Sequence, residues 1–287
     1  MATTPTLLQR LAHSARRHET PCAAGRVVWH SWGETGAAPL ILLHGGSGSW
    51  THWVRNIEPL QQAGWQLWVP DMPGFGDSDA PPDGQDADAL VPWLEAGAAR
   101  LLGHQAVPVV GFSFGGLVGG LWAAAEPARA SQLVLVGAPG FSNETLTPLA
   151  LRAWETEAPG PAREAAHRHN LMQLMLAHAS SADALAVHIH GANVERDRLR
   201  RRRLMRTDLL LRTLPQLRCR VDGLWGALDF IERLRPGLVA RSLPQAPHFG
   251  SLQLLPDAGH WVSYEAAEAF NAALLKLLGP ARASPYA

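Results

Sequence analysis

The chain has 287 residues, of which 47% are hydrophobic and 17% are charged. This composition supplies apolar material for a large buried core and excludes an intrinsically disordered chain. Lysine plus arginine and aspartate plus glutamate number 25 each, so no net charge favours nucleic acid or an anionic membrane as a partner. The length suits one α/β core domain with an insertion. The balanced charge suits a small or weakly charged substrate.

The cysteines and the N-terminal region predict a cellular location. Cys22 and Cys219 lie far apart and form no metal-type or redox-type spacing. This is typical of a reducing compartment, with a disulfide between the two as the alternative. Residues 1–25 contain no apolar run long enough for a secretory signal. We therefore expect a cytoplasmic protein.

Short apolar runs that end in glycine, proline or aspartate recur along the chain and predict the strands of a mostly parallel sheet. An earlier strand within 26–32 is expected to be antiparallel. The later strands are expected at 40–43, 67–69, 107–110, 133–136, 221–225 and 252–255. Helical patterns alternate with these strands over 53–64, 87–102 and 116–130. The alternation indicates βαβ units and an α/β fold.

Residues 106–125 contain no charged side chain, which by hydropathy alone would predict a membrane span. Five glycines and a serine interrupt this stretch. They divide it into a strand, a turn and a helix, so we expect no membrane as a partner.

A segment of about eighty residues between 136 and 221 is rich in Arg, His, Leu and Met at helical spacing. We predict a core domain formed by residues 1–140 and 218–287, with 141–217 as a helical lid. The densest charge cluster of this segment consists of Arg196, Arg198, Arg200, Arg201, Arg202, Arg203 and Arg206. We expect most of these arginines to be solvated. The alternative is that one of them points inward and binds a substrate carboxylate. The histidines of this segment are His167, His169, His178, His188 and His190. Their spacing matches no zinc motif, so we expect neither a metal nor a cofactor.

Residues 111–116 read Gly-Phe-Ser-Phe-Gly-Gly and contain the pattern G-x-S-x-G between an apolar strand and a helix of small residues. A serine on such a tight strand-to-helix turn is lifted clear of the sheet, and glycines permit the strained backbone. The pattern alone could be a glycine-rich turn. Its context favours Ser113 as a nucleophile.

Backbone N–H groups near this turn could stabilise an oxyanion. The start of the helix makes Phe114 the expected first donor. The second donor is expected in the loop His44-Gly45-Gly46-Ser47-Gly48, where glycine lets the backbone approach a substrate. We choose Gly46, with Ser47 as the alternative.

A serine nucleophile needs a base, and the base needs an orienting acid. In this type of fold both follow the serine in the order acid, then histidine, at the ends of later strands. Asp229 and His260 occupy those places. Asp229 could instead cap a helix, and Asp257 could compete as the orienting acid.

These motifs together resemble the α/β-hydrolase superfamily over nearly the whole chain outside the insertion. They are His44-Gly45-Gly46, the segment from Asp71 to Ser78, 111–116, Gly226-Ala227-Leu228-Asp229 and Asp257-Ala258-Gly259-His260. The resemblance implies a mostly parallel eight-stranded sheet flanked by helices. The serine at 113 distinguishes the chain from similar haloalkane dehalogenases and epoxide hydrolases, which use an aspartate nucleophile.

Two parts of the sequence are similar to the carbon–carbon bond hydrolases that cleave ring-fission products of aromatic compounds. They are residues 42–48, and Gly259-His260-Trp261 followed by Glu265 and Phe270-Asn271. Those enzymes usually carry asparagines at the positions held here by Phe112 and His52. Loss of two amides disfavours a charged dienolate substrate. We therefore expect an esterase for an apolar or aromatic substrate, with carbon–carbon bond cleavage as the first alternative.

Aromatic residues near the predicted site suggest an apolar pocket. Trp50, His52, Phe112 and Trp261 are the candidate lining residues, with plain core packing as the alternative for the tryptophans. A non-catalytic ligand-binding protein on the same fold is a further alternative. The sequence does not fix the oligomeric state, and a homodimer stays open.

Overall fold

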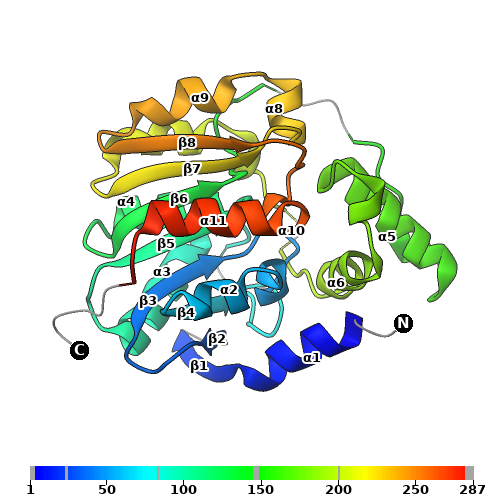
Figure 1. Ribbon diagram of the computed structural model, residues 1–287, viewed down its shortest axis with the longest axis horizontal. Helices are drawn as coiled ribbons and strands as arrows, with labels where there is room; N and C mark the ends of the chain where they lie inside the picture. Colours follow the sequence, from blue (N-terminus) through cyan, green and yellow to red (C-terminus); the bar gives the residue numbers. More distant parts are fainter. Residues whose placement is uncertain (1–3, 23–24, 83, 145–148, 200, 282–287) are drawn as a thin grey trace.

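The computed structural model describes residues 4–22, 25–82, 84–144, 149–199 and 201–281. Its centre is an eight-stranded sheet with the strand order β1-β2-β4-β3-β5-β6-β7-β8, which runs from the bottom to the top of Figure 1. The strands are β1 (Arg16–Cys22), β2 (Gly25–Trp32), β3 (Ala38–Leu43), β4 (Trp65–Asp71), β5 (Val107–Phe112), β6 (Ala130–Val136), β7 (Arg220–Gly226) and β8 (Phe249–Leu255).

The directions of the strands confirm the predicted architecture. All neighbouring pairs from β4 to β8 are parallel, whereas β2 is antiparallel to both β1 and β4. The antiparallel strand expected within 26–32 is therefore β2. The edge strand β1 was not expected, because its sequence RRHETPC has no apolar run.

Helices cover both faces of the sheet (Figure 1). The α-helices are α1 (Thr4–Ser14), α2 (Ile57–Gln62), α3 (Ala87–Leu102), α4 (Phe114–Ala125), α5 (Pro161–Leu174), α6 (Ala184–Glu195), α7 (Leu209–Thr213), α8 (Phe230–Leu234), α9 (Leu238–Ser242), α10 (Val262–Glu265) and α11 (Ala267–Leu278). Short 3₁₀ turns are η1 (Trp50–Trp53), η2 (Trp154–Thr156), η3 (Ala179–Ser181), η4 (Leu204–Arg206), η5 (Leu214–Gln216) and η6 (Leu243–Gln245).

The bounds of the predicted helices differ in an explicable way. The helix expected at 87–102 is α3. The helix expected at 116–130 begins earlier, at Phe114, and ends at Ala125. The helix ends two residues before Pro127. A proline disfavours helical geometry in the residue that precedes it, so the helix cannot readily continue through Glu126.

Alternating strand residues form two separate cores. Ile41 and Leu43 of β3 belong to one cluster with α3 and α4, whereas Leu40 and Leu42 belong to a second cluster with α2 and α11. Successive side chains of a strand point to opposite faces of a sheet. The central strands are therefore buried on both sides, as is typical of a parallel sheet.

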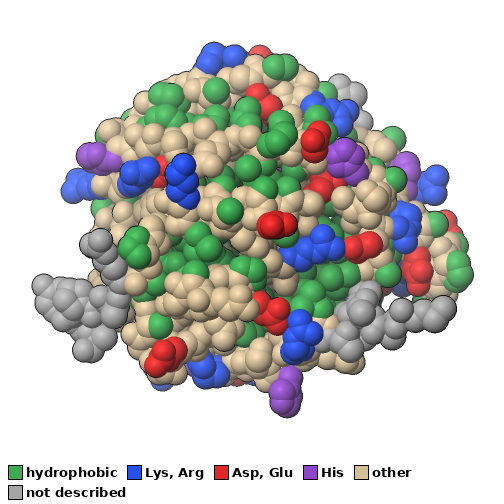
Figure 2. Space-filling view, viewed as in Figure 1, with side chains coloured by type: hydrophobic (Ala, Val, Ile, Leu, Met, Phe, Trp, Pro, Cys, Tyr) green, Lys and Arg blue, Asp and Glu red, His purple; other side chains and the backbone are tan. Residues whose placement is uncertain are grey.

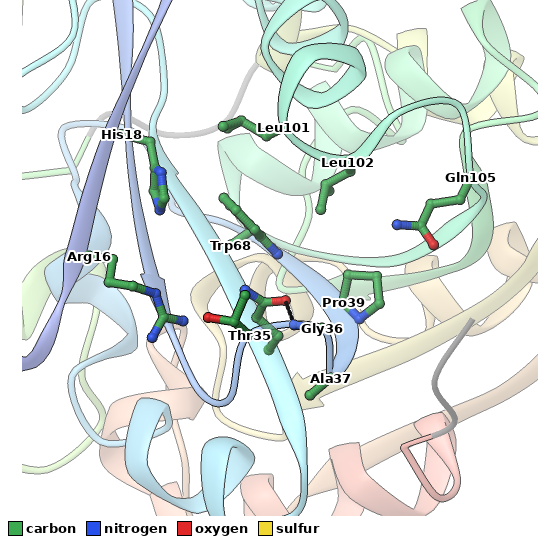
Figure 3. A pocket seen from close by; sticks show the side chains of 11 residues that line it. Arg16, His18, Thr35, Gly36, Ala37, Pro39, Trp68, Leu101, Leu102 and Gln105 are labelled. Atoms are coloured by element: carbon green, nitrogen blue, oxygen red, sulfur yellow. Dashed lines mark hydrogen bonds between the residues drawn. The ribbon is translucent and has the colours of Figure 1, made fainter. Parts of the chain in front are cut away.

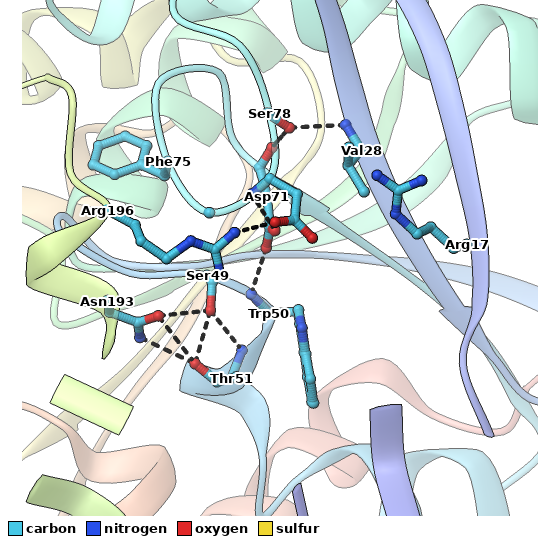
Figure 4. A network of polar contacts seen from close by, with 12 residues as sticks. Arg17, Val28, Ser49, Trp50, Thr51, Asp71, Phe75, Ser78, Asn193 and Arg196 are labelled. Carbon is cyan, nitrogen blue, oxygen red and sulfur yellow. Dashed lines mark hydrogen bonds and ion pairs between the residues drawn. The ribbon is translucent and has the colours of Figure 1, made fainter. Parts of the chain in front are cut away.

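The long connection between β6 and β7 carries α5, α6 and α7. In Figure 1, α5 and α6 lie together beyond one end of the strands. Asn193 of α6 contacts the core at η1, where its side-chain oxygen accepts the Ser49 hydroxyl at 2.8 Å and its nitrogen donates to Thr51 Oγ1 at 3.0 Å (Figure 4). These contacts fasten α6 beside the loop that follows β3.

Three further features of the structure bear on the disulfide, membrane and charge expectations from the sequence. Cys22 and Cys219 are both free, so the alternative of a disulfide between them is wrong. Among the described residues no helix is long and apolar enough to span a membrane. Figure 2 shows positive and negative side chains interspersed on the face viewed in Figure 1, which agrees with the balanced charge of the sequence.

Candidate active site

Ser113 lies on a sharp turn between β5 and α4. Its backbone angles are φ 51° and ψ −120°, a region that a residue with a Cβ atom adopts only under strain. The Ser113 N–H donates to the carbonyl oxygen of Val136 at 2.7 Å, which holds the turn against β6. The serine side chain is thereby presented at the carboxyl end of the sheet.

The glycines of G-x-S-x-G are required by close backbone contacts. A Cβ on Gly111 would lie 2.4 Å from the carbonyl oxygen of Gly115. A Cβ on Gly115 would lie 2.4 Å from the carbonyl oxygen of His44. Because backbone atoms cannot move aside as a flexible side chain can, larger residues at both positions would distort the turn.

His260 lies between Ser113 and Asp229. Its Nε2 is 2.9 Å from Ser113 Oγ, and its Nδ1 is 2.8 Å from Asp229 Oδ2. Asp229 is fully buried and His260 is only 4% exposed. The carboxylate favours a proton on Nδ1, which leaves Nε2 free to accept the hydrogen bond of the serine hydroxyl.

Asp229 combines the two roles that its sequence position suggested. One carboxylate oxygen, Oδ1, accepts the Ile231 N–H at 2.8 Å and caps α8. The other oxygen binds His260. The side chain of Asp257 is exposed, and its backbone oxygen forms a hydrogen bond of 2.9 Å with His178 Nε2. Asp229 is therefore the acid that the structure brings to His260.

The loop after β3 lies beside this turn. Ser47 has a positive φ of 49°, and the carbonyl oxygens of Leu43 and His44 closely approach Gly115 at the start of α4. The first N–H groups of a helix have no partner within it, and no hydrogen bond joins the N–H of Gly46 or Phe114 to another described residue. Gly46 and Phe114 therefore stay the candidate donors to an oxyanion.

Two buried histidines support the loop in their neutral forms. His44 Nε2 accepts the Met72 N–H at 2.9 Å, and His52 Nδ1 accepts the Gly45 N–H at 3.2 Å. Desolvation is the main cause that lowers the pKa of His44 and, more strongly, of His52. A neutral His52 that accepts at Nδ1 carries its proton on Nε2, so it offers a hydrogen-bond donor.

The candidate pocket residues divide into two groups. Phe112 and Trp261 are fully buried and His52 is 3% exposed. Their rings pack together, with His52 to Phe112 at 5.6 Å and His52 to Trp261 at 5.1 Å between centroids, and Phe112 lies 5.2 Å from His260. Trp50 instead packs on Trp32 at 5.4 Å. The structure thus places Phe112 and Trp261 in the core beneath Ser113, and Trp50 against β2.

Glu265 is a site residue to which the sequence assigned no role. Its carboxylate accepts backbone N–H groups from Ala177 at 3.0 Å, His178 at 2.9 Å and Gly259 at 2.6 Å. Gly259 immediately precedes His260, whereas Ala177 and His178 belong to the segment between β6 and β7. One carboxylate therefore joins that segment to the histidine loop.

A histidine of α6 predicts acid sensitivity of the fold. Desolvation, and secondly the charge of His167, lower the pKa of His190 from 6.5 to about 4. Since the unfolded chain binds this proton first, stability is full above about pH 6.5 and is lost as the pH falls toward about 4. We expect His190 to contribute a loss of ~2 kcal/mol at about pH 5. Thermal unfolding at about pH 7.5 and about pH 5 measures it, and His190→Gln should lose less stability than the wild type.

One group of described residues has the spacing of metal ligands. Potential ligand atoms of His30, Asp71 and Asp77 lie within 4.8 Å of one another. Asp71 already accepts the N–H groups of Trp50 (Figure 4) and Asp77, each at 2.9 Å. Arg196 forms an ion pair with Asp77. Because backbone N–H groups occupy both carboxylate oxygens of Asp71 and Arg196 balances the charge of Asp77, we assign no metal to this group.

A hollow of about 440 Å³ does not have Ser113 among its lining residues. Figure 3 shows the residues that line it. Pro39 and Gln66 line it near the starts of β3 and β4, and Trp68 and His18 form its inner side with ring centroids 5.0 Å apart. Ser113 follows the opposite, carboxyl end of β5. Ligands of open α/β sheets bind at the carboxyl ends of the strands, so this hollow is not the candidate active site.

The arginine cluster of the insertion is mostly exposed, as expected. Arg201, Arg203 and Arg206 are exposed, and Arg200 lies outside the described residues. Arg198 is exposed but donates through Nη2 to the carbonyl oxygen of Gly76 at 3.1 Å. Arg202 is the exception, because its side chain is only 15% exposed.

Comparison with known proteins places this geometry in a family. The family model described as the alpha/beta hydrolase fold matches residues 38–206, more than half of the chain. The chain belongs to the α/β-hydrolase family. It is therefore an enzyme, a hydrolase.

The relatives of this hydrolase include enzymes with established names. A 2-hydroxy-6-oxononadienedioate/2-hydroxy-6-oxononatrienedioate hydrolase from Comamonas testosteroni is 27% identical over 252 residues, which cover 83% of the hydrolase and 87% of the relative. A 2-hydroxy-6-oxo-6-phenylhexa-2,4-dienoate hydrolase from Burkholderia cepacia is 27% identical over 253 residues, with the same two coverages.

Solved structures share the fold of the hydrolase. A serine hydrolase from Cycloclasticus zankles has a TM-score of 0.73 at 18% identity, covering 92% of the hydrolase and 98% of that chain. A thermophilic esterase from Thermogutta terrifontis has a TM-score of 0.68 at 22% identity, with coverages of 92% and 98%. Both likenesses support the fold described above.

Proposed function

We propose that this hydrolase cleaves carboxylic esters of small apolar or aromatic molecules through an acyl-enzyme on Ser113. The observation that carries the proposal is the hydrogen-bonded chain from Ser113 Oγ through His260 to the buried carboxylate of Asp229, with contacts of 2.9 and 2.8 Å. A serine hydroxyl, a neutral imidazole and an orienting carboxylate in this order activate the serine as a nucleophile.

Acylation proceeds by attack of Ser113 Oγ on the ester carbonyl carbon while His260 Nε2 accepts the hydroxyl proton. The imidazolium is stabilised by Asp229 and returns the proton to the leaving alcohol as the carbon–oxygen bond breaks. Water then loses a proton to His260 and attacks the acyl-enzyme. The bond between Ser113 Oγ and the acyl carbon then breaks as His260 returns that proton to Oγ, which releases the free acid and leaves His260 neutral again.

The oxyanion of each tetrahedral intermediate is assigned to the N–H groups of Gly46 and Phe114. Their lack of described partners and their positions, in the loop after β3 and at the start of α4, support the assignment. Donors that are fixed before the reaction stabilise developing charge without reorganisation.

We further propose that residues 141–217 form a lid on the core of 1–140 and 218–287. The cytoplasmic location, the small-molecule partner and a homodimer stay predictions.

Carbon–carbon bond hydrolysis is the second candidate, because the relatives from C. testosteroni and B. cepacia carry the names of dienoate hydrolases. Two features of this chain favour esters over a charged dienolate. Position 112 is a phenylalanine and offers no hydrogen bond. Burial lowers the pKa of His52 and keeps it neutral, so it offers a charged substrate one N–H donor but no positive charge.

A substrate panel tests the proposal. Purified enzyme is compared on p-nitrophenyl acetate, butyrate, octanoate and benzoate and on 2-hydroxy-6-oxo-6-phenylhexa-2,4-dienoate. We expect kcat/KM for the best ester to exceed that for the dienoate by at least about tenfold. The reverse order would assign the second function. A fluorophosphonate should label Ser113 in either case, and absence of labelling and turnover would favour a non-catalytic binding protein.

A further inference from the structure

Arg202 differs from its neighbours because its guanidinium is turned into the protein. Its Nη1 donates to Asp197 Oδ2 and to the carbonyl oxygen of Leu199, each at 2.7 Å. Asp197 is 8% exposed. An arginine that is mostly buried and has a carboxylate partner is held in one orientation by its planar fork of donors. The pair is therefore a rigid feature of the segment between β6 and β7.

This ion pair also holds the loop after β3. Arg202 Nη2 donates to Ser47 Oγ at 3.0 Å, and the Ser47 hydroxyl donates to Asp197 Oδ2 at 2.5 Å. Ser47 is one of the non-glycine residues with a positive φ, 49°. A backbone in this region costs free energy and persists only where neighbouring contacts fix it. The ion pair supplies such contacts to the residue that follows Gly46.

The same guanidinium lies against both residues assigned to the oxyanion. A Cβ built on Gly46 would be 3.3 Å from Arg202 Nε, so the guanidinium packs directly on the Gly46 backbone. On its other side, Arg202 Cζ is 5.7 Å from the centre of the Phe114 ring and 5.4 Å from that of Phe75. Both distances fall within the range of a cation–π contact.

We propose that Arg202, held by Asp197, is a positioning residue that sets the N–H of Gly46 relative to the N–H of Phe114. The inference rests on the proposed function, because it assigns those two groups to the oxyanion. Since Asp197 balances the charge of Arg202, the pair acts mainly by fixing geometry. An error of about 1 Å in the position of a catalytic group can cost about 100-fold in rate.

The test compares Arg202→Met with the matched control Arg201→Met, which changes an exposed arginine of the same cluster. Ester kinetics should show kcat reduced about 10- to 100-fold in Arg202→Met, with KM within about threefold of wild type. Arg201→Met should behave as wild type. Arg202→Lys should stay impaired, because a single ammonium group cannot bond Asp197 and Ser47 in the same geometry.

Inhibitor affinities separate positioning from a general structural effect. A boronic acid forms a tetrahedral anion on the serine, whereas the carboxylic acid product stays planar. The inhibition constant of the boronic acid should rise in Arg202→Met by the same factor by which kcat/KM falls, while that of the product acid should not change. Equal losses for both inhibitors, or kinetics equal to Arg201→Met, would overturn the inference.

A second variant covers the case in which the loss of Arg202 prevents folding, since it leaves Asp197 buried without its partner. Ser47→Ala keeps the ion pair and removes the tie to the loop. It should lower kcat and boronic acid affinity together by about 3- to 10-fold, and unchanged values would refute the inference. Wild-type enzyme that neither turns over esters nor reacts with a fluorophosphonate would instead refute the proposed function.

Discussion

Ser113→Ala is expected to lower kcat for ester hydrolysis by at least about 10⁵-fold and to abolish labelling by a fluorophosphonate. The hydroxyl oxygen is the atom that becomes acylated, and it is the group that lies 2.9 Å from His260 Nε2. Alanine carries the same Cβ as serine, so it meets the same backbone strain at φ 51°. The melting temperature should therefore change little. Steady-state kinetics and intact mass spectrometry measure the two effects.

Ser180→Ala provides the control for this experiment, because Ser180 is exposed in η3. It should retain wild-type turnover and wild-type labelling. Residual activity of Ser113→Ala above about 1% of wild type, in a preparation free of other hydrolases, would remove Ser113 from the mechanism.

Asp229→Asn is expected to lower kcat by about 10⁴-fold with little change in KM. The physical reason lies in the helix cap. The Ile231 N–H donates to Oδ1 of Asp229 and would hold the oxygen of an asparagine at that position. The amide nitrogen would then face His260 Nδ1 and donate to it. His260 would carry its proton on Nε2, where it could no longer accept the proton of Ser113.

Asp257→Asn is the matched control, since Asp257 is the other acid of this region and is exposed. It should leave kcat within about twofold of wild type. Measurements on p-nitrophenyl esters at neutral pH suffice. If Asp257→Asn lost activity and Asp229→Asn retained it, the orienting acid would be reassigned.

The sequence predicted the central strands and the three polar residues at their ends for a common reason. Strands buried on both faces are continuous apolar runs, and Ser113 and Asp229 each follow such a run. His260 follows the edge strand β8, which is only partly buried but still ends in apolar residues. By contrast, β1 is an edge strand in which Arg16 and Arg17 are exposed. Its pairing with β2 is made by backbone groups and does not require apolar side chains, so no apolar pattern marked it.

Contacts between distant segments could not be predicted from either segment alone. Arg202 is separated from Ser47 by 155 residues, and seven arginines in one short stretch gave no sign of which one turns inward. The same limit applies to Phe112 and Trp261. Position in the sequence placed both near the site, but only the packing of His52 and Trp53 around them put them in the core.

The three N–H groups gathered by Glu265 have a consequence for the design of chimaeras. A segment between β6 and β7 taken from another hydrolase would bring its own backbone at the positions of Ala177 and His178. If that backbone did not meet the carboxylate, Glu265 would keep only Gly259 and the loop of His260 would be less restrained. Exchange of substrate preference by segment grafting therefore requires that the graft and α10 be transferred as one unit.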